Sequence, residues 1–585
     1  MFENEQQQVT QKICKFCIQN DLPETKFQWK SIPFSGLWGM STSFFQMAAL
    51  EARTGKNIVV NQRAQELAEM VVSDLADSEG FEHIEAKNGY LNLYFATEEY
   101  ARRVINRVLL EKERFGRGGI KGEKIMVEFS QPNTHKAFHV GHLRNVILGE
   151  SICRLLDFAG YDVVRANYIG DIGLHVIKWL WNYQTNHIGE VPGENKTRWM
   201  GEIYSEADRK FEESDQVKAG VRQLFAKWDQ GDERVVELWR QTRQWSLDGF
   251  DQIYDVLGVH FDRVYFESEV EEIGKDFVRE LIAKQIARDE RPEGAVIVPL
   301  DEILGEKEKY RVLVVLRSDG TSLYSTKDLP LAKRKFDEYQ LNRSVYIIDV
   351  RQSLYMQQIF KTLELMGYSW AKNCYHLAYE IVNLPGNVTM SSRDGTVVLL
   401  EDLIQEATER ALEIVKAKNP DLSQESQRKI AKGVALGAIK YPMLSRENTK
   451  TVTFDWNTAL DINGQAAPYI QYAFVRANSI LKKSGGELTE TAHPEYELSR
   501  PEIQLIDLIS RLPNEVEKAS NEFRPLYLSS LGFELARAFN DFYNQCPVLQ
   551  AEEGVKLTRL RIVTAARQTI KNILFLLGIE APDVM

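Results

Sequence analysis

The chain has 585 residues, 44% of them hydrophobic and 27% charged, which is typical of a globular protein and excludes disordered, collagen-like and disulfide-stapled classes. Its five scattered cysteines, a start without a signal sequence and no stretch near ~18 apolar residues predict a reduced, cytoplasmic protein that does not enter membranes. The net charge of −12 does not exclude nucleic-acid partners, because binding requires only a local basic face.

The beginning of the chain predicts a separate small α/β domain. Thr97 precedes two acidic residues, a pattern of helix starts in which Thr97 is the cap, so we expect a helix through 100–114. Three glycines within 115–119 then indicate a domain boundary. These signals place the N-terminal domain at residues 1–118.

The next segments have the pattern of a parallel sheet. Residues 125–129 form a short apolar run typical of a strand, followed by a helix at 143–159 and a second strand at 163–168. A strand, a helix and a strand within ~45 residues make a βαβ unit. We therefore expect a Rossmann-type, doubly wound catalytic domain.

This domain is interrupted. Residues ~185–300 are polar and heavily charged, and we interpret them as one or more insertions that contain a helix near 235–257. Asp319-Gly320, between strand-like runs at 311–316 and 322–326, predicts a hairpin. The strand–helix–strand alternation then resumes at 345–349, 354–366 and 376–382. The catalytic domain with its insertions is expected at 119–420.

The remainder of the chain predicts an all-α domain, because strand signals end near residue 400. Long helical patterns occupy 468–483, 502–521, 526–543 and 555–577. We expect a C-terminal helical bundle at 421–585, with its core at about 465–585.

Two features of this bundle could bind nucleic acid. The segment 555–572 has no acidic residue and carries Lys556, Arg559, Arg561, Arg567 and Lys571. An anionic partner and a solvated helix face explain this pattern equally well. Tyr469 and Tyr472 begin another helix, where they could stack on bases or pack in the core.

The sequence HVGH at 139–142 lies between the first predicted strand and its helix. Free N–H groups and the helix dipole make a helix N-terminus suitable for phosphate. His139 and His142 could donate hydrogen bonds to nucleotide oxygens, and Gly141 would allow close backbone approach. The alternative is a helix cap with incidental histidines.

Glu128 stands at the end of an otherwise apolar strand, where a carboxylate is costly unless a cation meets it. The cation is either a distant Lys or Arg of the chain or a ligand, and the sequence leaves both open. A further polar loop, Met390-Ser391-Ser392-Arg393, has the composition of an anion-binding loop, although most such segments are turns.

Together these segments resemble class I aminoacyl-tRNA synthetases, and specifically the arginyl-tRNA synthetase family, over nearly the whole chain. The resemblance is carried by VEFSQPN at 127–133, Lys136 and HVGHLR at 139–144, which are close to that family's extended HIGH signature. Further matches are GDIG at 170–173, FDW at 454–456, PYIQYA at 468–473, NGYLNL at 88–93 and the carboxyl terminus.

The resemblance implies an arginine–tRNA ligase that forms arginyl-adenylate from L-arginine and ATP, then charges tRNA(Arg). It implies ATP with Mg²⁺ as substrate, no zinc, no tightly bound cofactor, and arginine activation that needs bound tRNA. The implied ATP contacts are His139, Gly141, His142, Met390, Ser391 and Ser392. The implied arginine contacts are Glu128, Asn133, Tyr324, Asp328 and Gln358, and the implied anticodon contacts are Tyr469, Tyr472 and Met585.

Two departures from the family pattern matter. The KMSKS signature reads TMSSR at 389–393, so both lysine positions differ. Lys136 matches a lysine that many arginyl enzymes carry before HIGH, and we assign it the role of stabilising pyrophosphate, with help from Arg393. Ile172 replaces the usual tryptophan, and His175 replaces a common glutamine.

Three alternatives remain. A synthetase for cysteine or glutamine is disfavoured by the two acidic residues Glu128 and Asp328 and by the lack of zinc-binding cysteines. Cys14 and Cys17 form the one CxxC, which lies in a predicted helix where core packing is favoured over metal binding. A small nucleotidylyltransferase would be far shorter. A tRNA-binding paralogue with a dead site would fit the lost KMSKS lysines. We expect a monomer.

Overall fold

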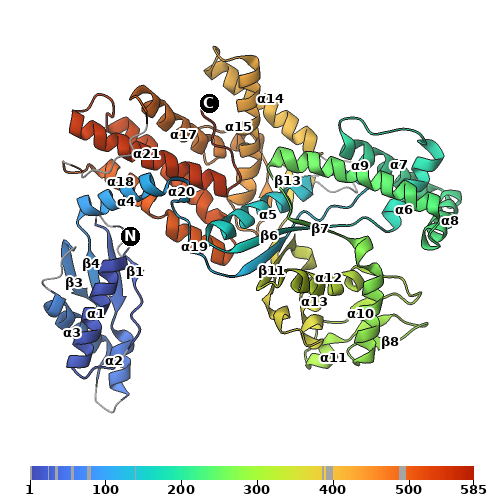
Figure 1. Cartoon of the computed structure of the whole chain (residues 1–585), viewed down its shortest axis with the longest axis horizontal. Coiled ribbons are helices and arrows are strands. Elements are labelled where there is room, and N and C mark those ends of the chain that lie inside the picture. The colour runs from blue at the N-terminus through green and yellow to red at the C-terminus, as the bar shows by residue number, and fades with distance from the viewer. Residues whose placement is uncertain are drawn as a thin grey trace. The chain divides into compact units, whose positions relative to one another are not determined.

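The computed structural model describes residues 3–23, 25–32, 34, 37–53, 58–75, 81–138, 140–384, 388–389, 399–486, 494 and 496–585. Figure 1 shows the course of the chain. The chain divides into two compact units. One comprises Met1–Phe115, Arg476–Leu512 and Glu534–Asn572, and the other comprises Gly116–Val475, Pro513–Phe533 and Ile573–Met585. No helix in the described parts of the chain is long and apolar enough to cross a membrane.

The first unit contains an antiparallel sheet of order β1-β2-β4-β3. Its strands are β1 (Lys30–Ser31), β2 (Gly39–Ser43), β3 (His83–Lys87) and β4 (Tyr90–Tyr94). Its N-terminal helices are α1 (Glu3–Gln19), α2 (Phe45–Ala52), α3 (Val60–Leu75) and α4 (Thr97–Glu111). Helix α4 begins where predicted, but its N-cap is Ala96 rather than Thr97. Cys17 packs in the core with its Sγ 4.0 Å from Met47 Sδ, whereas Cys14 is exposed.

The second unit is built on a five-stranded parallel sheet of order β12-β11-β5-β6-β7. The strands are β5 (Lys124–Glu128), β6 (Asp162–Ile169), β7 (Arg263–Phe266), β11 (Arg343–Asp349) and β12 (Cys374–Tyr379). Helices α5 (Val140–Phe158), α12 (Tyr324–Tyr339) and α13 (Ser353–Leu365) belong to the same unit. The predicted doubly wound fold is confirmed, and the strand order reverses between β5 and β11.

The predicted insertion at ~185–300 is only partly correct, because β7 within it is a strand of the central sheet. Before β7, α6 (Leu174–Asn186), α7 (Lys196–Glu213), α8 (Asp215–Asp229) and α9 (Glu233–Leu257) lie together (Figure 1). These helices share an apolar core. After it come α10 (Glu271–Ala283), β8 (Arg288–Asp289), β9 (Val296–Val298) and α11 (Leu300–Leu304). Only four residues long, β7 is flanked by charged residues and gave no clear strand signal.

The predicted hairpin around Asp319-Gly320 forms only as a turn closed by one antiparallel bridge, between Leu316 and Ser322. Strand β10 (Leu313–Leu316) pairs with β9, and the run expected to form its partner begins helix α12 instead. Two hydroxyls hold this helix start against β10: Ser325 donates to the carbonyl of Val314 and Thr326 to that of Val315, each at 2.5 Å. Side-chain hydroxyls at the helix start thus limit the pairing that the DG turn favours to a single bridge.

The predicted all-α region consists of α14 (Leu400–Lys418), α15 (Gln424–Leu444), α16 (Trp456–Ala459), α17 (Ala467–Lys483), α18 (Arg500–Ser510), α19 (Leu512–Glu522), α20 (Leu526–Gln545) and α21 (Glu553–Leu576). A small sheet of β13 (Val382–Leu384), β14 (Val388–Thr389) and β15 (Val452–Thr453) joins it to the Rossmann part. The single helix predicted at 502–521 is two, because Pro513 cannot donate a hydrogen bond inside a helix.

The basic helix α21 uses its charges within the first unit. Arg559 donates to Glu502 at 2.8 Å, and Lys571 donates to Glu113 at 3.1 Å. Lys556 lies 3.4 Å from Glu553. These ion pairs favour the structural interpretation of the run over an anionic partner.

Candidate functional site

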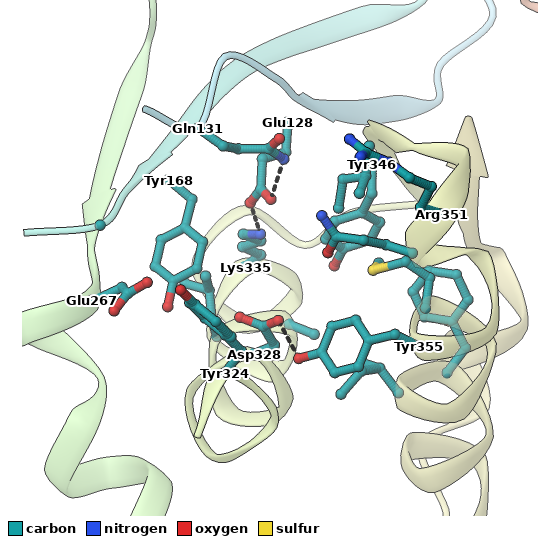
Figure 2. Close-up of a pocket in the computed structure, with 18 of the residues that line it drawn as sticks. Glu128, Gln131, Tyr168, Glu267, Tyr324, Asp328, Lys335, Tyr346, Arg351 and Tyr355 are labelled. Carbon is teal, nitrogen blue, oxygen red and sulfur yellow. Dashed lines mark hydrogen bonds and ion pairs between the residues drawn. The ribbon is translucent and has the colours of Figure 1, made fainter. Parts of the chain in front are cut away.

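A cavity of about 450 Å³ lies at the carboxyl ends of β5, β6 and β11, where the strand order reverses. Ligands of open α/β sheets bind at such positions, because the helices on either side leave a crevice there. Residues of the strand ends form one side of the cavity, and α12 and α13 form the other (Figure 2). Polar lining residues include Glu128, Gln131, Asn133, Tyr168, Glu267, Tyr324, Asp328, Lys335, Arg351, Gln352 and Tyr355.

Glu128 already has a cation from the chain. Its carboxylate forms an ion pair with Lys335 of α12, and both side chains are almost fully buried. Gln131 Nε2 donates to the other carboxylate oxygen at 3.0 Å (Figure 2). Of the two alternatives for this buried carboxylate, the structure therefore contains the buried ion pair. A lysine 207 residues away in sequence thus supplies a counter-ion from the chain, while Glu128 also lines the cavity.

Asp328 lies in the same cavity without an ion pair to a described residue. Tyr355 Oη donates to its carboxylate at 2.6 Å (Figure 2). Desolvation in the cavity raises the pKa of Asp328 to about 7, the Tyr355 hydrogen bond opposes this rise, and the nearby carboxylates of Glu128 and Glu267 add to it. A carboxyl group in this setting favours a cationic ligand, which would stabilise its ionised form.

Glu267, at the end of β7, was not predicted from the sequence. Its carboxylate forms a buried ion pair with Lys327 of α12, and burial raises its pKa. Tyr324, one turn before Asp328, is 64% exposed at the same cavity. Asn133 lies in the loop after β5 and bridges to Gly170 in the backbone. The structure thus brings Asn133, Tyr324 and Asp328 together.

Gln358 does not line the cavity. Its side-chain amide donates to the carbonyls of Tyr310 at 2.6 Å and Val312 at 3.2 Å, away from the cavity. The cavity face of α13 follows the helical spacing of 352, 355, 356 and 359, and at 100° per residue position 358 falls on another face. Gln352 lines the cavity and is the glutamine that the sequence argument missed.

The predicted nucleotide site is described only in part. His139 and the loop residues Met390, Ser391, Ser392 and Arg393 lie outside the described residues. Gly141 and His142 are in the first turn of α5, and the His142 ring is 5.0 Å from that of Phe138.

Lys136 is oriented towards the helices between β6 and β7. Its Nζ lies 4.9 Å from the centre of the Tyr204 ring on α7. Burial lowers the pKa of Lys136, Asp208 opposes this shift, and Lys178 adds to it. The Lys136 ammonium faces an aromatic ring and lies near a second cation, so its charge is only partly neutralised. Such a charge is suited to binding an anionic ligand.

The GDIG segment contributes one apolar core residue and one buried carboxylate that accepts hydrogen bonds. Ile172 packs in the apolar core of α6–α9, and the carboxylate of Asp171 accepts hydrogen bonds from Arg243 and Ser268. The ring of His175 is largely buried, and its Nε2 has no hydrogen-bond partner among the described residues. Burial, together with Lys136 and Lys327, lowers the pKa of His175 to about 3, so its ring is neutral.

Arg144, in the first turns of α5, joins several segments near the site. Its guanidinium donates to the backbone carbonyls of Glu380, Ile381, Glu447, Asn448 and Lys450. Burial lowers its pKa to about 10. The helix that begins with HVGH is thereby fixed to the residues just before β13 and just before β15.

The residues predicted to contact an anticodon are only partly accessible. The Tyr469 ring packs 5.3 Å from that of Phe533, and Lys418 Nζ lies 5.1 Å from the Tyr472 ring. Met585 is 7% exposed, so its side chain belongs to the core rather than to the surface.

Comparisons with known proteins agree with this architecture. Residues 104–456 match the catalytic domain of class I tRNA synthetases (R), and residues 470–585 match the DALR anticodon binding domain. The arginine–tRNA ligase of Clostridium perfringens is 36% identical over 529 residues, covering 90% of this chain and 91% of that protein. That of Bdellovibrio bacteriovorus is 35% identical over 513 residues, covering 86% of each.

A solved structure extends the likeness to the whole fold. The arginyl-tRNA synthetase of Thermus thermophilus superposes with a TM-score of 0.77 at 26% identity, covering 99% of this chain and 100% of that one. The likeness therefore spans the N-terminal sheet unit, the parallel sheet and the helical region. On these grounds the chain belongs to the arginyl-tRNA synthetase family.

Proposed function

We propose that this chain is an arginine–tRNA ligase, which activates L-arginine with ATP and transfers it to the 3′-terminal adenosine of tRNA(Arg). The observation that carries the proposal is Asp328, a half-buried carboxylate with no ion pair to a described residue, in a cavity at the sheet's switch point. Membership of the family supports the same reaction. The dead-site alternative would not need to preserve such a costly group.

In this proposal the guanidinium of arginine meets Asp328, with Tyr324 beside it at the mouth of the cavity. A guanidinium presents planar, forked donors, which suit a carboxylate better than the compact ammonium of lysine does. Asn133 and Gln352 hold the rest of the amino acid, since both line the same cavity. Gln352 thus replaces Gln358 in the proposed contact set, and Glu128 contributes beside Asp328 as a carboxylate already paired with Lys335.

ATP enters as its magnesium complex, a substrate rather than a resident cofactor. His139, Gly141 and His142 are proposed to bind it at the start of α5, where the helix dipole favours phosphate. Met390, Ser391, Ser392 and Arg393 are proposed to contact the same nucleotide. Catalysis of adenylate formation then consists of positioning and of stabilising charge at the α-phosphate and the leaving pyrophosphate.

Lys136→Ala is expected to slow adenylate formation by about a hundredfold, because the pyrophosphate loses its stabilising cation. Arginine binding should persist, since Lys136 does not line the arginine cavity. The measurement is arginine-dependent ATP–pyrophosphate exchange in the presence of tRNA. Lys121→Ala is the matched control, because Lys121 also lies against a tyrosine ring, 5.0 Å from that of Tyr161. Unchanged exchange in the Lys136 variant would reject its assignment.

The partners and domains follow the same proposal. Residues 421–585 would read the anticodon, with Tyr469 and Tyr472 as the candidates for base stacking, because both rings keep part of their surface. Met585 would need to leave the core to take part. The N-terminal domain, residues 1–118, would contact another part of the tRNA, and the enzyme would act as a monomer in the cytoplasm.

The experiment that tests this function is ATP–pyrophosphate exchange with each standard amino acid, with and without bulk tRNA. Exchange with arginine alone among the amino acids, and only with tRNA, is the expected result. Exchange without tRNA would support the ligase function but contradict the proposed dependence of arginine activation on tRNA. Exchange with cysteine or glutamine, or no exchange and no arginine binding, would favour one of the alternatives.

A further inference from the structure

The arginine cavity contains more carboxylates than one cationic side chain needs. Glu128, Glu267 and Asp328 all line it, yet the chain supplies a lysine to two of them. Lys335 pairs with Glu128 and Lys327 pairs with Glu267. Formally the group carries a charge of −1, so the cavity can neutralise a single further cation.

The environment of the Lys335 ammonium is that of a lysine-binding site. Besides the Glu128 carboxylate, three tyrosine rings surround it, with centres 4.7 Å (Tyr346), 5.8 Å (Tyr265) and 6.0 Å (Tyr168) from Nζ. A carboxylate and aromatic faces are the groups that bind a compact ammonium in a dry site. The chain fills this place with its own side chain, 1% exposed.

We propose that Lys335 determines amino-acid specificity: it occupies the part of the cavity beside Glu128 and the three tyrosine rings that would otherwise suit the ammonium of a substrate lysine. The inference rests on the proposed arginine–tRNA ligase function. Arginine is directed to Asp328, which lies two helical turns before Lys335 on α12. Lysine would find Glu128 already paired with Lys335, and Asp328 matches the forked guanidinium better than a compact ammonium.

Removal of the Lys335 ammonium should therefore admit lysine. In Lys335→Met the Glu128 carboxylate loses its partner, and a buried unpaired carboxylate attracts any cation that reaches it. A free lysine can place its ammonium among the same rings. The ratio of arginine to lysine affinity should fall by about tenfold or more, which corresponds to the loss of one good charge-assisted contact.

The test is equilibrium dialysis of the full chain with labelled arginine or labelled lysine, without ATP or tRNA. The variants are Lys335→Met, Glu128→Gln/Lys335→Met and Asp328→Asn. Lys333→Met is the matched control, since Lys333 lies on the same helix but at its exposed surface, paired with Asp337. Circular dichroism and thermal unfolding establish that each variant is folded.

The expected result is increased lysine binding in Lys335→Met, and loss of that increase in the double variant, which no longer has the Glu128 carboxylate. If Lys335→Met alone fails to fold, the double variant still allows the test. The double variant should still prefer arginine over lysine. Asp328→Asn, in contrast, should not bind arginine. An unchanged arginine-to-lysine ratio in folded Lys335→Met would overturn the inference. So would a loss of arginine binding in the double variant as large as in Asp328→Asn. If the unaltered chain binds neither amino acid, the proposed function itself fails.

Discussion

Replacement of Asp328 by asparagine should weaken arginine binding by about two to three powers of ten, with little change in the fold. A buried charge that loses its partner typically costs about 3–5 kcal/mol, and asparagine has almost the same shape as aspartate. The measurement is the KM for arginine in tRNA charging, together with equilibrium dialysis. Asp337→Asn, on the exposed face of the same helix, is the control.

The pH dependence separates this role of Asp328 from a purely structural one. Its pKa is raised to about 7 in the free cavity, so the carboxyl gains a proton as pH falls through that value. A bound guanidinium favours the ionised form, and arginine must therefore displace the proton below pH 7. Arginine affinity should fall by about tenfold between pH 8 and pH 6. Asp328→Asn should remove this dependence, and a pH dependence that persists in the variant would contradict the assignment.

The second large effect is expected at Arg144. Arg144→Met removes the guanidinium donor from five part-buried backbone carbonyls, three of which (Ile381, Glu447 and Asn448) keep a backbone donor, so it should destabilise the protein by about 2–3 kcal/mol. The variant should also slow adenylate formation by about a hundredfold, since small displacements of catalytic groups have effects of that size. Thermal unfolding and single-turnover adenylate formation measure the two effects.

Arg144→Lys is the informative companion of this variant. Lysine keeps the charge but offers fewer donors in a different geometry, so it should recover stability more than rate. The KM for arginine should change little in either variant, because Arg144 does not line the arginine cavity. A full rate in folded Arg144→Met would show that the start of α5 does not need this anchor.

The parts of the fold that the sequence predicted are those with local signals. The apolar run at 125–129, the HVGH turn and the helix after it lie together in sequence, and β5 and α5 form where expected. Helix α9 was found in the same way, from the spacing of its apolar residues. Strand β7 was missed because four residues in a charged segment carry little pattern.

The candidate site depends even more on contacts between residues far apart in sequence, which local patterns do not reveal. Glu128 was recognised as a carboxylate that needs a cation, but its partner Lys335 follows 207 residues later, and only folding brings them together. Asp328 and Tyr324 were placed correctly in one cavity through the family resemblance. Gln358 was misassigned because a resemblance to the family does not say which face of α13 a residue occupies. The pairing of Glu267 with Lys327 had no signal in the sequence.

In the proposed reaction this chain charges tRNA with arginine through a cavity whose key carboxylate is Asp328. The most direct measurement is the transfer of labelled arginine to bulk tRNA by the full chain, beside Asp328→Asn and with unlabelled lysine as competitor. The account predicts arginyl-tRNA from the unaltered chain, resistance to excess lysine, and almost no product from the variant. Absence of arginyl-tRNA, or equal yields from both proteins, would contradict it.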